Sequence, residues 1–78
     1  MTLDHIDDFL LLSIGKGEPD EAQLIKDVML LARLGNLKFS GTPGEVSAKL
    51  NKLERSGLIV RDAGVMRMGS VEAQKGLW

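Results

Sequence analysis

Apolar residues follow a helical period over most of the 78-residue chain and a period of two near its end. The first helix is expected to begin at Thr2, whose hydroxyl can cap it, and to end at Gly15-Lys16-Gly17. Acids in its opening turns suit the positive end of the helix dipole. These acids are expected to face solvent: Asp4, Asp7 and Asp8.

A second helix is predicted from Pro19 to Gly35-Asn36, because proline is tolerated in a first turn and glycine often follows a helix. Its apolar stripe is so broad that we expect the helix to pack on two sides. The stripe consists of Leu24, Ile25, Val28, Met29, Leu30, Leu31, Ala32 and Leu34. After it, Leu37-Lys38-Phe39 alternates briefly and is a candidate for one short strand.

The third predicted helix, Glu45 to Ser56, follows a turn of glycine, threonine and proline. Val46, Leu50 and Leu53 are spaced i, i+4, i+7 and define its buried side. Gly57 is expected to end the helix, since glycine adopts the left-handed conformation of a C-terminal cap at little cost.

A β-hairpin is predicted after the third helix, where the apolar period changes to two. Its strands, Leu58 to Arg61 and Val65 to Met68, would be joined by the turn Asp62-Ala63-Gly64. In that register one face carries Leu58, Val60, Met66 and Met68, and the other carries Ile59, Arg61, Val65 and Arg67. The whole pattern predicts a single α+β domain, residues 1–78, of three helices followed by a two-stranded hairpin.

The composition is that of a globular protein, with 44% hydrophobic and 27% charged residues. Ten Lys+Arg nearly balance 11 Asp+Glu, but the charges are unevenly placed. Residues 1–35 hold seven acids and three bases, a net charge of −4, whereas residues 36–78 hold four acids and seven bases, a net of +3. This asymmetry indicates a side that faces anions, although a chance imbalance in so short a chain looks the same.

The chain lacks the residue sets on which catalysis and metal binding usually depend. It has no cysteine, and His5 is its only histidine, so thiolate and multi-histidine metal sites are excluded. No nucleophile has a base to activate it, and we expect neither an enzyme nor a cofactor. Apolar runs such as Phe9 to Leu12 are far shorter than the roughly 18 residues of a membrane span. We therefore expect a cytoplasmic protein with no membrane association.

The segment from Val46 to Ile59 reads V-S-A-K-L-N-K-L-E-R-S-G-L-I. It resembles the recognition helix and first wing strand of winged helix-turn-helix regulators of the MarR and PadR families, and the resemblance extends over about residues 42–76. It implies a winged helix-turn-helix fold, binding to double-stranded DNA and a role in transcription regulation. Glu45 and Ala48 depart from the pattern, because these regulators often carry Thr, Ser or Arg there.

The outward side of the third helix and the hairpin supply the candidate DNA contacts. Opposite the buried stripe, Asn51, Lys52 and Arg55 can donate to base edges and phosphates. Arg61 and Arg67, opposed across the exposed face of the hairpin, are expected to hold phosphates. With the two flanking residues, the candidate DNA-binding set is Ser47, Lys49, Asn51, Lys52, Arg55, Arg61 and Arg67.

Two kinds of partner remain possible for such a domain. A DNA-binding protein of this size makes few contacts alone, so we expect a homodimer on a two-fold symmetric site. Its candidate interface residues are Leu11, Leu12, Leu77 and Trp78. The alternative is a winged-helix module that docks on a protein and binds no DNA, which the near-neutral charge and the acidic first half favour.

Overall fold

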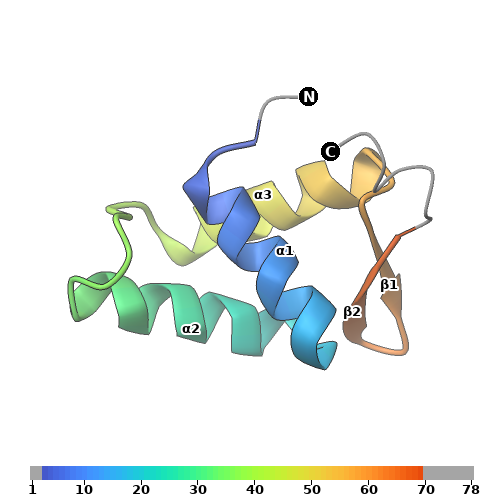
Figure 1. The fold of residues 1–78 in the computed structure, drawn as a ribbon, viewed down its shortest axis with the longest axis horizontal. Coiled ribbons are helices and arrows are strands. Elements are labelled where there is room, and N and C mark those ends of the chain that lie inside the picture. The colour runs from blue at the N-terminus through green and yellow to red at the C-terminus, as the bar shows by residue number, and fades with distance from the viewer. Residues whose placement is uncertain (1–2, 70–78) are drawn as a thin grey trace.

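A computed structural model, shown in Figure 1, describes residues 3–69 of the chain. The predicted fold class is confirmed: three helices precede a two-stranded antiparallel hairpin. The elements are α1 (His5–Gly17), α2 (Glu21–Arg33), α3 (Pro43–Arg55), β1 (Ile59–Asp62) and β2 (Val65–Met68). Thr2, Leu77 and Trp78, named above as a cap and as interface candidates, lie outside the described residues.

The first helix begins later than its sequence pattern indicates. Asp4 is the N-cap in place of Thr2, and its carboxylate accepts the backbone N–H groups of Ile6 and Asp7 at 3.0 and 2.9 Å. The side chain of Asp7 accepts in turn from the N–H of Asp4, which completes a capping box. The helix ends at Gly17, within the predicted Gly15-Lys16-Gly17, and the next residue, Glu18, is a left-handed C-cap with φ of 46°.

The second helix is capped by Asp20, ends before Gly35 as predicted, and packs chiefly on α3. The expectation that it packs on two sides is wrong, because only Leu24 and Val28 are fully buried. Two leucines of the broad stripe remain exposed, Leu30 at 47% and Leu34 at 62%. α2 therefore carries more apolar surface than the core of this domain covers.

The candidate strand at Leu37 to Phe39 is also wrong, because these residues form no strand and their apolar side chains pack on the edge of the core. The outer edge of β2 pairs with the connection between α1 and α2 instead. There the N–H of Met66 donates to the carbonyl of Pro19 at 2.8 Å, and Asp20 forms a bridge with Val65.

The third helix confirms the predicted buried stripe, since Val46, Leu50 and Leu53 are all completely buried. Thr42 caps it and Pro43 occupies its first turn, so it starts two residues before the predicted Glu45. Gly57, with φ of 84°, follows its end and returns the chain to the core, as expected.

The hairpin turn has two residues and not three. Ala63 and Gly64 both have positive φ, 53° and 84°, as a type I′ turn requires. Asp62 and Val65 therefore pair directly as strand residues. Because side chains alternate along a strand, this shift of one position reverses the predicted faces of β1.

The reversed face changes which hairpin residues enter the core. Ile59, predicted on the exposed face, is completely buried, whereas Val60 is 44% exposed. Arg61 now pairs with Met66, and Arg67 pairs with Val60. The two arginines thus lie on opposite faces of the hairpin, and the expectation that they share one face is wrong.

One hydrophobic core lies where α1 meets α3 and β2 and where α2 covers α3. Leu11, a predicted interface residue, belongs to this core with 8% exposure, whereas Leu12 is 63% exposed. Among the described residues, no helix is long and apolar enough to cross a membrane.

Candidate nucleic-acid interface

The outward side of α3 carries three of the candidate DNA-binding residues, two of them exposed and one half-buried. Asn51 and Arg55 are exposed, as is Ala48 one turn before them, and Ser47 beside them is half-buried. Their spacing of three, four and seven positions places Ala48, Asn51 and Arg55 on one face of the helix. This row is opposite the buried stripe, as predicted.

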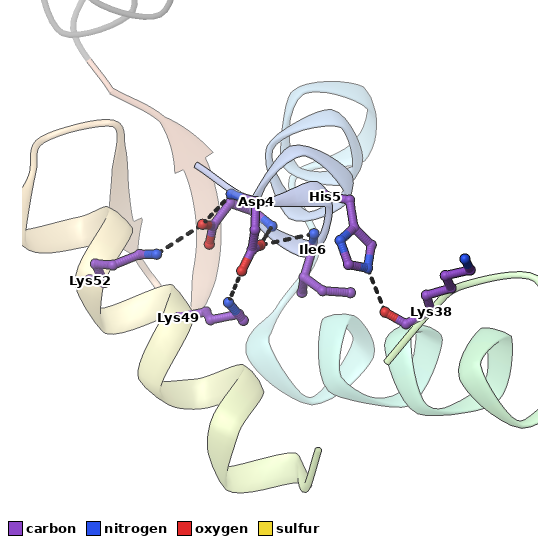
Figure 2. A network of polar contacts seen from close by, with 7 residues as sticks. Asp4, His5, Ile6, Lys38, Lys49 and Lys52 are labelled. Atoms are coloured by element: carbon purple, nitrogen blue, oxygen red, sulfur yellow. Dashed lines mark hydrogen bonds and ion pairs between the residues drawn. The ribbon is translucent and has the colours of Figure 1, made fainter. Parts of the chain in front are cut away.

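One flank of α3 is bound to the start of α1, as Figure 2 shows. Lys49 Nζ lies 2.5 Å from Asp4 Oδ2, and Lys52 Nζ lies 2.8 Å from Asp7 Oδ2. Both lysines belong to the predicted DNA-binding set, and both bind the acidic N-terminal turn of their own chain. Each of these ammonium groups already has a carboxylate partner, which offsets part of the charge that it could offer to a phosphate.

Asp7 is completely buried, so the expectation that it faces solvent is wrong. The sequence did contain the signal, because Asp7, Leu10, Leu11 and Ile14 are spaced i, i+3, i+4, i+7 and so share one face of α1. Within the described residues its Oδ1 atom has no hydrogen-bond partner. Lys52 therefore places its ammonium group against a buried carboxylate, which would otherwise be costly to bury.

The hydrogen bond from Lys49 lowers the pKa of Asp4 from its usual 3.8 to about 2. The same bond raises the pKa of Lys49 above its usual value. Both groups are therefore charged across the neutral range, and the cap of α1 is tied to α3 by a charge-assisted hydrogen bond.

The other flank of α3 is bound to β1 through Arg61. Its Nε donates to Glu54 Oε1 at 3.0 Å, and its Nη2 donates to Asn51 Oδ1 at 2.8 Å and Glu21 Oε1 at 3.2 Å. One guanidinium thus joins α2, α3 and β1. Arg61 is a structural clamp in this conformation, and it also fixes the orientation of the Asn51 side chain.

Arg67, on the other face of the hairpin, lies between two acids. Its Nε is 3.6 Å from Glu18 Oε2, and its Nη1 is 3.4 Å from Asp62 Oδ2. All three side chains are about half exposed, between 47% and 59%. Such exposed pairs contribute about 0–1 kcal/mol, so a phosphate could compete for Arg67 more easily than for Lys52.

These contacts neutralise the charge that the second half of the sequence carries. Four of the five predicted basic contacts are ion-paired, and their partners are six different acids. In the part of the chain that the structure describes, Arg55 is the one predicted base without an ion pair. The four paired bases are Lys49, Lys52, Arg61 and Arg67, and the acids are Asp4, Asp7, Glu18, Glu21, Glu54 and Asp62.

His5 Nε2 forms a hydrogen bond with the carbonyl oxygen of Lys38, at 2.5 Å, which holds the start of α1 to the α2–α3 connection (Figure 2). Over residues 3–69 no three His, Cys, Asp or Glu side chains are grouped as a metal site would require.

The three helices, the hairpin and the bond from β2 to the α1–α2 connection form a winged-helix-like topology. No family model matches the chain, and neither a curated protein nor a solved structure matches it.

Proposed function

We propose that this chain binds duplex DNA through the outward row of α3, with the hairpin beside it as the wing. The observation that carries the proposal is that Ala48, Asn51 and Arg55 are exposed in one row. Both flanks of the row are fixed by ion pairs, to α1 on one side and to β1 on the other. A rigid helix with an open polar row suits insertion into a major groove.

The side chains of this row match the groups that bases present in the major groove. Arg55 can donate two hydrogen bonds to guanine, and Ala48 can contact the methyl group of thymine. The Oδ1 atom of Asn51 already accepts from Arg61, so its amide nitrogen is the group left to donate. Asn51 therefore favours a purine N7 or a phosphate over the two-bond adenine contact.

The ion pairs indicate that each copy binds only a few phosphates. Arg55 has no ion pair within residues 3–69, Arg67 is the most exposed of the paired bases, and Lys52 is committed to a buried acid. We therefore propose weak binding by one copy and functional binding by a homodimer on a two-fold site, as a transcriptional regulator would use. Leu12 is the exposed interface candidate that the structure describes.

The test is fluorescence anisotropy with a labelled mixture of genomic duplexes at 50 and 200 mM salt. The logarithm of the binding constant is expected to fall with a slope of about 0.9 per phosphate contacted, hence about 2–3 per copy. Arg55→Ala is expected to weaken binding about 10-fold, and Lys16→Ala, which replaces another exposed base, on α1, is expected to leave binding unchanged. Absence of binding at 50 mM, or equal affinities of both variants, would overturn the proposal.

A second function is favoured by the neutralised charge. Four predicted phosphate contacts bind acids of the same chain, which is the arrangement of a domain that presents its surface to a protein. A winged-helix-like interaction module would give a stoichiometric complex with one protein and no shift of any duplex. Copurification at fixed stoichiometry, combined with flat anisotropy for all duplexes, would decide in its favour.

A further inference from the structure

The outward face of α2 combines two exposed cations with two exposed leucines. Lys26, Leu30, Arg33 and Leu34 are spaced i, i+4, i+7, i+8, and so form one stripe about 12 Å long on a helix that rises about 1.5 Å per residue. All four are exposed, the leucines at 47% and 62%. We call these four residues the α2 stripe.

The two bases of the α2 stripe differ from four of the five basic residues in the predicted DNA-binding set, because neither forms an ion pair or side-chain hydrogen bond within residues 3–69. Arg33 lies in the last turn, where a cation also offsets the negative end of the helix dipole. Lys26 lies in mid-helix and has no such role. The nearest acid in sequence, Asp27, is half-buried and accepts a hydrogen bond from Gln23, so it lies at the border of the stripe.

The leucines of the α2 stripe have no counterpart in the core. The domain buries Leu24 and Val28 from the opposite side of the helix, and α3 covers that side. Of the four large hydrophobic residues exposed within the described part of the chain, Leu30 lies in α2 and Leu34 is the C-cap of the same helix, one turn later. Neighbouring exposed leucines flanked by unpaired cations are typical of a contact surface.

We propose that the α2 stripe is a docking surface for an acidic amphipathic helix of a protein partner. Charge complementarity selects this occupant: two Glu or Asp side chains would meet Lys26 and Arg33, and two apolar side chains would cover Leu30 and Leu34. Two turns of helix match the length of the stripe, and helices pack at about 8–10 Å by interlocking such rows. The stripe belongs to α2 and not to α3, so the proposal stands whether or not α3 binds DNA.

The probe is a fluorescein-labelled, helix-stabilised peptide of about 14 residues, with Leu and Glu at i, i+3, i+4 and i+7. Anisotropy is measured with the whole chain at 50 and 200 mM salt, beside a scrambled peptide of the same composition. The ordered peptide is expected to bind at least 10-fold more tightly than the scrambled one. The ordered peptide is also expected to bind less tightly at the higher salt concentration.

Two double variants test the two halves of the stripe. Lys26→Gln with Arg33→Gln, and Leu30→Gln with Leu34→Gln, are each expected to weaken peptide binding at least 10-fold. Lys16→Gln, at an exposed lysine of α1 outside both proposed surfaces, serves as the matched control and is expected to bind the peptide like the parent chain. Because the substituted side chains are exposed, unchanged circular dichroism is expected and shows that the variants remain folded.

Three results would overturn the proposal. The first is equal affinity for the ordered and scrambled peptides. The second is failure to bind the peptide together with binding to phosphatidylserine vesicles that Lys26→Gln with Arg33→Gln abolishes. The occupant is then an anionic membrane surface. The third is that the parent chain sediments as a dimer whereas Leu30→Gln with Leu34→Gln sediments as a monomer. The stripe would then bind a second copy of the chain.

Discussion

The ion pair between Lys52 and Asp7 makes the sharpest prediction about stability. Asp7 is completely buried, its Oδ1 atom has no partner within the described residues, and its Oδ2 atom accepts from Lys52 at 2.8 Å and from the N–H of Asp4 at 3.1 Å. Replacing Lys52 by Met keeps much of the side-chain volume but removes the cation. A carboxylate would then remain buried without a compensating charge.

The expected cost follows from the burial of the two partners. Removing one partner of a fully buried pair costs about 3–5 kcal/mol. The side chain of Lys52 is 41% exposed, so water screens part of the interaction and we expect about 2 kcal/mol for Lys52→Met. A domain of this length has a total stability of about 4–12 kcal/mol, so the variant is expected to fold. It is expected to unfold at a lower urea concentration than the parent chain.

The control is the neighbouring pair of Lys49 and Asp4, whose side chains are 22% and 48% exposed. Lys49→Met is expected to cost about 1 kcal/mol or less, because Asp4 remains partly solvated. Urea denaturation followed by circular dichroism at pH 7 measures both variants, and an unchanged slope with urea would show that each unfolds as the parent does.

A double-mutant cycle tests the reasoning directly. Asp7→Asn keeps an oxygen that can accept from Asp4 but removes the buried charge. In that background Lys52→Met is expected to cost less than about 0.5 kcal/mol, a coupling of about 1.5 kcal/mol between the two residues. Equal costs of Lys52→Met with Asp7 and with Asn at this position would refute the claim that Lys52 compensates a buried carboxylate.

Three further predictions concern the ends and turns of the elements. The pKa of Asp4 is lowered to about 2 by Lys49, so the stability that this carboxylate contributes is complete above pH 3.8 and is lost as the pH falls toward 2. Over that pH range, the urea concentration at the midpoint of unfolding is expected to fall less for Asp4→Asn than for the parent chain. Gly64 has φ of 84°, so Gly64→Ala is expected to destabilise the hairpin by about 1–2 kcal/mol in urea denaturation. Leu11→Ala, in the core at 8% exposure, is expected to cost about 2–4 kcal/mol by the same assay, and Leu12→Ala, at 63%, less than about 0.5 kcal/mol.

The parts of this fold that depend on residues close together in the sequence were predictable from the sequence. The buried stripe of α3 repeats every three to four positions, and the stop at Gly57 needs a left-handed residue, which glycine supplies most cheaply. Both features are encoded within about one or two helical turns. The candidate row on α3 follows from the same period, because the exposed side of a helix is opposite its buried side.

The hairpin register was not predictable from the same kind of pattern. Asp62-Ala63-Gly64 fits a three-residue loop as well as it fits the end of a strand followed by two turn residues. The structure adopts the second arrangement, with Ala63 at φ of 53°, a conformation that residues with a Cβ seldom adopt. What favours it is burial, since the observed register places Ile59 in the core and turns Val60 outward.

The charge asymmetry of the sequence acquires a different meaning once the helices are packed. Four ion pairs join an acid of residues 1–35 to a base of residues 36–78, so the two halves of the chain complement each other. Which acid pairs with which base depends on how α1 crosses α3. The two residues of each lysine pair are 45 positions apart in the sequence, so no local sequence pattern predicts these pairs. A basic second half therefore does not imply a basic surface. Within residues 3–69, Arg55, Lys26 and Arg33 are cations without an ion pair, and for that reason Arg55 and the α2 stripe carry the two proposals.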